Sequence, residues 1–376
     1  MNLPLESRTR CWAEIDLSAL RHNARVAREA AGPGASLLAV VKADAYGHGM
    51  GPIARALHAE GLAERFAVAN VAEAIALRGH LPDAPVTILS PALPDERPEI
   101  VRHGFLPWVS TPEEAGDYAR LAREQCGEGA PFGVVIVVDT GMGREGVLPG
   151  GLGALRQTVE ALSSLRWQGT VTHLPSADED TAFTAAELAG FEHLLAAAPP
   201  AGERHAQNSA GLLGFPPPAR CNVVRPGLML YGASPLPEHQ ARLRPVLTLK
   251  TRVSLVRDLP AGHGVSYGRT FVTDRPTRVG TLAAGYADGY PRHLSNAGAE
   301  VLVRGRRCPV LGRVTMDQVM INLGALPAVG AGEEVVLLGR QGTEEIPVAE
   351  LAARAGTIPW EIFTGLTTRV GRYYAA

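Results

Sequence analysis

The sequence predicts an α/β fold in which a (β/α)8 barrel of the TIM type is followed by a mostly antiparallel β domain. From about residue 12 to residue 236, eight short apolar runs alternate with helical patterns, which is typical of a parallel sheet covered by helices. Beyond that point, period-two runs separated by turn residues replace the alternation and favour an antiparallel sheet. We therefore expect a barrel over residues 12–236 and a second domain over residues 245–376.

Each expected barrel strand is a short apolar run. The runs are Leu37–Lys42, Arg65–Asn70, Val86–Ser90, Leu106–Ser110, Gly133–Thr140, Gly169–Leu174, Arg204–Asn208 and Asn222–Arg225. The helices expected between them are Leu17–Ala31, Pro52–Glu60, Val71–Arg78, Pro112–Gln125, Leu152–Leu165 and Thr184–Ala197. Thr111-Pro112-Glu113-Glu114 is a strong helix start, because it combines an N-cap residue, a proline in the first turn and two acids at the positive end of the helix dipole.

The second domain begins after an expected linker, Pro237–Pro245. Its expected strands are Val246–Val256, Thr277–Ala283, Ala299–Arg304, Val319–Leu323 and Glu334–Leu338. A helix over Val348–Ala355 and a last ordered stretch, Trp360–Tyr374, complete it.

Composition excludes several classes of partner. A net charge of −2 provides no basic excess for nucleic acid or an anionic membrane, and no apolar run approaches the ~20 residues of a membrane span. The four cysteines are scattered without a CxxC pair, which disfavours a metal site or a disulfide framework and fits a reducing cytoplasm. The N-terminal residues contain no apolar signal core.

Polar residues cluster at the carboxyl ends of the expected strands, where barrel enzymes carry their active sites. They are Lys42, Asn70, Ser90, Arg144, His173, Asn208 with Ser209, and Arg225. Strand ends that converge on one face would bring these distant residues into a single pocket.

Lys42 is the most informative of them. The chain has only two lysines, Lys42 and Lys250, and uses arginine for all its other basic residues. A lysine can lose its proton and form a Schiff base, which arginine cannot. The phenol of Tyr46 and the glycines after it suit a phosphate group. The alternative is a lysine that merely persists in an arginine-rich sequence.

The run Lys42-Ala-Asp-Ala-Tyr-Gly-His-Gly49 closely resembles the cofactor-attachment signature of the alanine racemase family. The resemblance extends over nearly the whole chain. It implies that Lys42 carries pyridoxal 5′-phosphate (PLP) as a Schiff base, and that residues 1–11 return to the β domain. It also implies a homodimer in which the β domain of one subunit closes the barrel mouth of the other.

Racemisation needs a base on each face of the substrate, and PLP to stabilise the deprotonated carbon. Lys42 is one base. Tyr267, in Gly-Val-Ser-Tyr-Gly-Arg-Thr, matches the family tyrosine that acts on the opposite face from the partner subunit; read alone it is an ordinary turn tyrosine. Arg225 matches the family arginine at the pyridine nitrogen, where a guanidinium donates a hydrogen bond and leaves that nitrogen unprotonated. Read alone, it is a surface arginine after a strand.

The remaining site residues also rest on the resemblance. It places His173 in a hydrogen-bond network with Arg225 and Tyr267, although a lone histidine at a strand end is more often structural. It places Arg144 near the phenolic oxygen of PLP and the substrate carboxylate. The phosphate-cradle positions are Tyr46, Asn208, Ser209 and Gly227. Met316 and Asp317 match a substrate-side segment contributed by the partner subunit, and Tyr286 matches a position that narrows the entrance.

Three positions depart from the family pattern. Val137 stands where many members carry a carbamylated lysine, so another group must hold Arg144. Thr315 replaces a common cysteine, and Trp360 replaces a tyrosine that assists the phosphate; an indole cannot accept a hydrogen bond.

The resemblance therefore implies a racemase that interconverts L- and D-alanine and supplies D-alanine for peptidoglycan, and the scattered cysteines favour a cytoplasmic location. Three alternatives stay open at this stage. A racemase of broader specificity differs only in pocket size. A PLP-dependent decarboxylase of the same plan pairs the pyridine nitrogen with an acid, which Arg225 disfavours. A non-catalytic PLP carrier resembles the barrel alone and lacks the second domain.

Overall fold

The computed structural model describes residues 10–127, 129–199 and 202–376 and divides them into two compact units. One unit is the barrel, Leu20–Ala45 with Met50–Arg244. The other unit is the β domain, which holds Pro245–Ala376 together with the described residues up to Ala19 and the short segment Tyr46–Gly49. The expected return of residues 1–11 lies largely outside the described residues.

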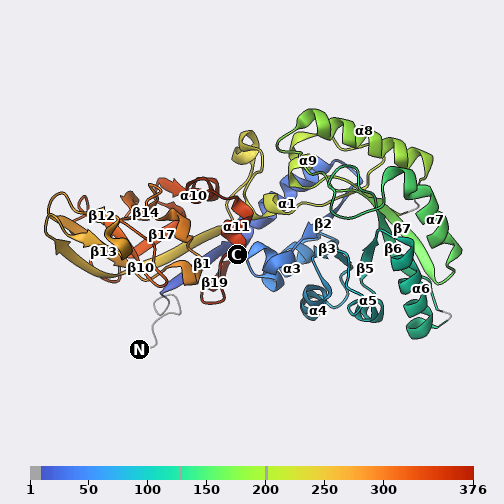
Figure 1. The fold of residues 1–376 in the computed structure, drawn as a ribbon, viewed down its shortest axis with the longest axis horizontal. Coiled ribbons are helices and arrows are strands. Elements are labelled where there is room, and N and C mark those ends of the chain that lie inside the picture. The colour runs from blue at the N-terminus through green and yellow to red at the C-terminus, as the bar shows by residue number, and fades with distance from the viewer. Residues whose placement is uncertain (1–9, 128, 200–201) are drawn as a thin grey trace. The chain divides into compact units, whose positions relative to one another are not determined.

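The barrel is a parallel sheet of eight strands in the order β8-β7-β6-β5-β4-β3-β2-β9 (Figure 1). It closes between β8 and β9, where Asn222 N donates to Arg204 O and Arg225 N donates to Gln207 O, each over 3.0 Å. All eight predicted strands are confirmed. Their bounds are β2 (Ser36–Val40), β3 (Arg65–Val68), β4 (Val86–Ile88), β5 (Leu106–Val109), β6 (Phe132–Val137), β7 (Leu165–Val171), β8 (Glu203–His205) and β9 (Val223–Val224).

Helices cover the outside of the barrel strands (Figure 1). The capping box predicted at Thr111 is present: its side chain accepts from Glu114 N, and Glu114 reaches back to Thr111 N. The expected helix Leu152–Leu165 is four residues too long, because Leu165 already pairs with Phe132 as a strand. Among the barrel helices, the sequence missed two short ones, α5 and α9. The helices are α1 (Leu17–Ala31), α3 (Met50–Ala59), α4 (Val71–His80), α5 (Arg97–His103), α6 (Pro112–Cys126), α7 (Leu152–Ala161), α8 (Thr181–Ala197) and α9 (Ser209–Gly214).

The segment expected to be a linker, Pro237–Pro245, runs up to the boundary between the two units at Arg244 and Pro245. Residues Pro237–Arg242 form a 3-10 helix, η4. Asn23 on α1 holds its far end, since its side chain donates to Arg244 O and accepts from Arg244 N, each over 2.8 Å. These long-range hydrogen bonds tie the end of the segment to the barrel.

The β domain is mostly antiparallel, as predicted. Its main sheet has the order β15-β14-β17-β10-β1-β19, with β13 and β16 added beside β10 and β18 beside β17. Only β1 and β19 pair in parallel. The strands are β1 (Cys11–Asp16), β10 (Leu247–Leu259), β11 (Gly264–Val265), β12 (Phe271–Val272), β13 (Thr277–Leu282), β14 (Glu300–Val303), β15 (Arg306–Pro309), β16 (Val319–Asn322), β17 (Glu334–Gln341), β18 (Glu344–Ile346) and β19 (Gly371–Ala375), and the helices are α10 (Val348–Ala355) and α11 (Pro359–Thr364).

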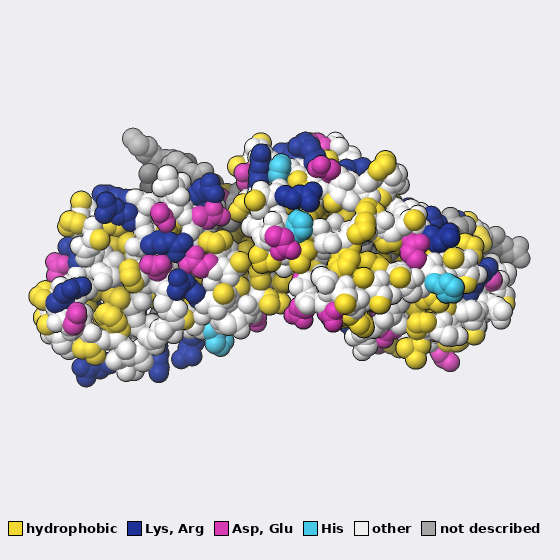
Figure 2. Space-filling model, turned by 90° about the horizontal axis from the view of Figure 1, so that it is seen from above, with side chains coloured by type: hydrophobic (Ala, Val, Ile, Leu, Met, Phe, Trp, Pro, Cys, Tyr) yellow, Lys and Arg dark blue, Asp and Glu magenta, His cyan; other side chains and the backbone are white. Residues whose placement is uncertain are grey.

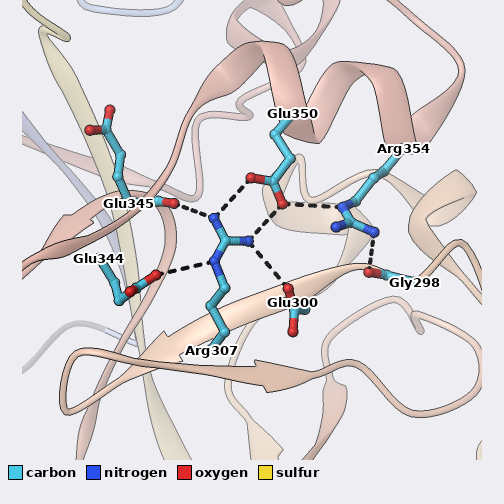
Figure 3. Close-up of polar contacts among 7 residues, drawn as sticks. All are labelled: Gly298, Glu300, Arg307, Glu344, Glu345, Glu350 and Arg354. Atoms are coloured by element: carbon cyan, nitrogen blue, oxygen red, sulfur yellow. Dashed lines mark hydrogen bonds and ion pairs between the residues drawn. The ribbon is translucent and has the colours of Figure 1, made fainter.

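An ion-pair network on β15 ties α10 to this sheet (Figure 3). The Arg307 guanidinium binds Glu350 through two nitrogens, over 2.8 and 3.0 Å, and also contacts Glu300 and Glu344. Glu350 in turn accepts from Arg354 over 3.2 Å. Paired contacts of this geometry fix the orientation of both partners.

Charged side chains of both signs are interspersed over the face seen in Figure 2, in keeping with the small net charge. Within the described part of the chain, every helix is too short or too polar to cross a membrane.

Candidate active site

Lys42 lies two residues after the end of β2 and begins a left-handed turn. In α2 (Lys42–Tyr46), Ala43, Asp44 and Ala45 have φ of 51 to 53° and ψ of 47 to 52°, and Tyr46 has φ of 53°. Left-handed backbone costs an L-residue about 1–2 kcal/mol, so four such residues in succession mark a strained segment at a functional site.

Three hydrogen bonds hold this turn. Glu73 on α4 accepts from Ala43 N over 2.7 Å with one carboxylate oxygen and from Ala69 N over 2.8 Å with the other. Asp44 accepts from Met50 N, also over 2.7 Å. The sequence did not single out Glu73, which braces the backbone beside Lys42.

The glycines of the motif have a packing role in the β domain. A side chain at Gly47 would place its Cβ 2.2 Å from Phe363 O, and one at Gly49 would meet the Tyr374 hydroxyl. Both residues also have positive φ. A side chain at either position would therefore displace its neighbour, which gives both glycines a packing role. The approach of a phosphate to these glycines stays a prediction.

Burial and charge together prepare Lys42 to lose its proton. Burial, and then the nearby Arg144 guanidinium, lower the pKa of Lys42, while Glu73 and Glu145 act in the opposite direction. A lowered pKa increases the fraction of free amine, which is the nucleophilic form.

Arg225 follows β9 and is 3% exposed. Its Nη2 donates to Thr172 O over 2.7 Å and to Ala206 O over 3.1 Å, and lies 3.3 Å from His173 Nδ1. Its Nη1 lies 2.7 Å from His205 Nδ1. The predicted contact between Arg225 and His173 is therefore present, and His205 is a neighbour that the sequence missed.

Both histidines are held neutral. Burial, and then the Arg225 charge, lower the pKa of His173 to about 3. Burial lowers the pKa of His205 to about 4, against the opposing influence of Glu203, whose carboxylate lies 3.4 Å from Nε2. Burial lowers the pKa of Arg225 to about 10, which leaves it charged at neutral pH.

Arg144 lies on a loop after β6. Two side chains hold the backbone of this loop by accepting hydrogen bonds from its glycine amides. Asp139 accepts from Gly141 N and Gly143 N, and Ser110 accepts from Gly146 N over 3.0 Å. Arg144 donates through Nε and Nη2 to Glu145 Oε1, over 3.1 and 2.9 Å.

Val137, the first departure from the family pattern, packs in an apolar cluster with Trp108, Val135 and Val171. It makes no hydrogen bond with Arg144, whose guanidinium donates instead to the neighbouring Glu145.

The expected phosphate-cradle residues of the barrel are engaged locally. Asn208 caps α9 through Gly211 N and donates to Leu174 O over 3.0 Å. Ser209 Oγ accepts from Gly227 N over 3.0 Å, which leaves its hydroxyl hydrogen as a donor.

The remaining predicted residues lie in the β domain. Tyr46 is 8% exposed, and burial raises its pKa to about 12, so its phenol is a proton donor at neutral pH. Tyr267 is 72% exposed. Two backbone hydrogen bonds join the segment of Tyr286 to that of Met316. Tyr286 N donates to Thr315 O, and Ala287 N donates to Met316 O, each over 3.0 Å.

Asp317 is oriented by Arg369, a residue that the sequence analysis did not single out. Arg369 contacts the Asp317 carboxylate over 2.9 Å and the buried Asp288 carboxylate over 3.4 Å. Its partners lie some 50 and 80 residues away along the chain, so no local pattern could have indicated it.

A cavity of about 550 Å³ lies at the opposite, amino-terminal ends of the barrel strands, lined by residues such as Arg65, Thr87, Leu106, Arg166 and Glu203. None of the predicted site residues lines it, so it is distinct from the face that carries Lys42.

Comparisons with known proteins agree with this architecture. Residues 15–235 match the family model of the alanine racemase N-terminal domain, and residues 246–374 match that of the C-terminal domain. The chain is 41% identical to the alanine racemase of Halothermothrix orenii over 374 residues, which cover 96% of each chain.

Solved structures show the same likeness. The alanine racemase of Streptomyces lavendulae superposes with a TM-score of 0.90 at 35% identity, covering 100% of this chain and 98% of the other. The alanine racemase of Bartonella henselae, solved with covalently bound pyridoxal phosphate, superposes with a TM-score of 0.87 at 30% identity, covering 98% and 100%. The chain therefore belongs to the alanine racemase family, an isomerase family with this barrel and β domain.

Proposed function

We propose that this protein interconverts L-alanine and D-alanine with PLP bound to Lys42. The observation that carries the proposal is the placement of Lys42 and Arg225 after neighbouring strands. β2 and β9 pair in parallel, and Val40 N donates to Pro226 O over 3.0 Å. An amine poised to lose its proton and a buried guanidinium thus share one end of the barrel.

The residues present fit PLP. Lys42 supplies the amine, and Arg225 presents donors alone to a ring nitrogen, which would therefore stay unprotonated. Tyr46 and Ser209 supply hydroxyl donors for a phosphate, with Asn208 and Gly227 shaping that part of the backbone. When bound, PLP stabilises the electron pair left on the substrate when its α-proton is removed.

Two bases then move the proton. The Lys42 amine would take or return it on one face of the substrate. The partner subunit's Tyr267 would do so on the other, in a homodimer whose β domains, residues 245–376, reach each other's barrel. The high exposure of Tyr267 in the single chain supports this arrangement, because it leaves the phenol accessible to a second subunit.

Arg144 would receive the substrate carboxylate, with Met316, Asp317 and Tyr286 of the partner subunit enclosing it. His173 would steady Arg225. We further propose a cytoplasmic enzyme that supplies D-alanine for peptidoglycan.

The test is proton NMR of the purified protein with PLP in deuterium oxide, started from either enantiomer of alanine. We expect loss of the α-proton signal from both, with optical rotation falling to zero. Borohydride reduction followed by mass spectrometry should find the cofactor on Lys42. Release of carbon dioxide without racemisation would instead establish a decarboxylase.

A further inference from the structure

Glu145 has an unusual environment for a loop carboxylate. Its side chain is only 5% exposed, whereas its partner Arg144 is 47% exposed. Two of the three guanidinium nitrogens of Arg144, Nε and Nη2, donate to the same carboxylate oxygen of Glu145, Oε1. The other oxygen, Oε2, is buried and has no hydrogen-bond partner among the described residues. A buried carboxylate in this state is costly, so a structural role is a poor explanation for it.

The loop does not need Glu145 for its shape. Asp139 and Ser110 bind its backbone, and Gly146 is required because a Cβ there would lie 2.7 Å from Asp139 N. Among the described residues, the Glu145 carboxylate makes hydrogen bonds to Arg144 and none to the backbone of this loop. A leucine of similar size would fill the same buried space without the cost of desolvating a charge.

Glu145 does face a group of basic side chains. Burial raises the pKa of Glu145, and the charges of Arg144, Arg225 and Lys42 oppose that effect. Reciprocally, Glu145 raises the pKa of Lys42 and of Arg225. The other acid near Lys42 is Glu73, whose two oxygens already bind backbone amides.

We propose that Glu145 is a positioning residue that orients the Arg144 guanidinium for a carboxylate ligand and balances the positive charge of Lys42, Arg144 and Arg225. This role rests on the proposed function, since the carboxylate ligand would be that of the amino acid substrate. Oε1 fixes the edge of Arg144 formed by Nε and Nη2, which leaves Nη1 free to meet a ligand.

The first test uses the apoprotein and does not depend on activity. Because the chain has only two lysines, labelling with ¹³C,¹⁵N-lysine gives one signal for Lys42 and one for Lys250. Titration of the wild type and Glu145→Gln should show the pKa of Lys42 falling by at least about half a pH unit in the variant, because a negative charge that favours the ammonium is lost. Lys250, paired with Glu14 and Glu334, is the internal control and should not move.

Glu160→Gln is the matched control variant, since Glu160 pairs only with Arg156 on the exposed face of α7. It should leave both lysine titrations unchanged. An unchanged Lys42 titration in Glu145→Gln would overturn the proposal, whether or not the protein racemises alanine. A protein that fails to bind PLP or racemise alanine, yet shows the Lys42 shift, would overturn the proposed function and leave the charge role of Glu145 standing.

The second test separates orientation from folding. We expect Glu145→Gln and Glu145→Leu to raise KM for alanine about tenfold or more with a smaller change in kcat, because Arg144 then binds the carboxylate in more than one orientation. Their thermal midpoints should equal or exceed that of the wild type. Glu145→Asp should recover part of the loss, and formate should partly rescue Glu145→Ala. An unchanged KM in Glu145→Gln would overturn the positioning role.

Discussion

Arg225 Nη1 lies 2.7 Å from His205 Nδ1 inside the barrel. A guanidinium only donates, so Nδ1 of His205 must accept and the ring proton lies on Nε2, on the side of Glu203. The same argument applies to His173, whose Nδ1 faces Arg225 Nη2 over 3.3 Å. One arginine thus fixes the tautomers of two neutral histidines and is itself held on two sides.

This arrangement predicts a loss of stability in mild acid. The pKa values of His173 and His205 in the folded state, about 3 and about 4, lie below the ordinary value of 6.5. The unfolded chain therefore binds more protons, and the stabilising contribution of the two groups is complete above pH 6.5 and is lost as the pH falls toward 4. Urea unfolding of the apoprotein should show the midpoint falling between pH 7 and pH 5.

Replacing one histidine should weaken that pH dependence. In His205→Asn the amide oxygen can still accept from Arg225 but does not titrate. We therefore expect the free energy of unfolding to depend less steeply on pH, by up to about 1.4 kcal/mol per pH unit. His263→Asn, at an exposed histidine of the β domain, is the control and should keep the wild-type slope. A wild-type slope in His205→Asn would contradict the assignment.

Tyr267→Phe should abolish proton exchange on one face only. We expect exchange of the α-proton of L-alanine in deuterium oxide to fall by about 10²- to 10⁴-fold, the usual contribution of a positioned acid–base group. Exchange of D-alanine through Lys42 should persist. Tyr373→Phe on β19 serves as the control. Equal loss for both enantiomers would argue against a one-face role for Tyr267.

The left-handed turn after Lys42 predicts that position 43 tolerates glycine better than a β-branched residue. Ala43 is exposed and has φ of 51°. Ala43→Val should destabilise the protein by about 1–2 kcal/mol, because a β-branched residue tolerates left-handed backbone poorly. Ala43→Gly should change stability by less than about 1 kcal/mol, since glycine adopts this conformation freely. Urea unfolding compares the two; identical effects would mean that the turn is not left-handed in solution.

Loss of the Arg307 network should lower the free energy of unfolding more than loss of a single surface ion pair does. Arg307→Met should cost about 1–3 kcal/mol, because several charge-assisted hydrogen bonds are lost together. Arg340→Met, which removes a 69%-exposed arginine paired with Glu345 alone, should cost less than about 1 kcal/mol. The hydrogen bond from Arg307 lowers the pKa of Glu350, so the difference between the variants should shrink as the pH falls below about 4.5. Chemical denaturation at pH 7 and pH 4 checks both points.

Most of the barrel could be predicted because its signals are local. The apolar runs of β2 to β9 and the capping box at Thr111 each depend on residues that are close together in the sequence. One helix bound was wrong: the helix expected to reach Leu165 ends at Ala161, because Leu165 pairs with Phe132 in the sheet. The 3-10 helix η4 within the expected linker was not predicted, and the segment is tied to the barrel through the distant contact of Asn23 with Arg244.

By itself, the sequence determined which residues bring the reactive groups: one of only two lysines at a strand end, an arginine in place of an acid after β9, and a tyrosine between glycines in the β domain. The tertiary structure alone decided which groups surround them. His205 contacts Arg225 between barrel strands, and Glu73 on α4 binds the turn after Lys42. Glu145 is next to Arg144 in the chain, but the fold of the loop is what buries its carboxylate. Those contacts depend on long-range hydrogen bonds and on burial, which set the charge of each group and which no local pattern of residues encodes.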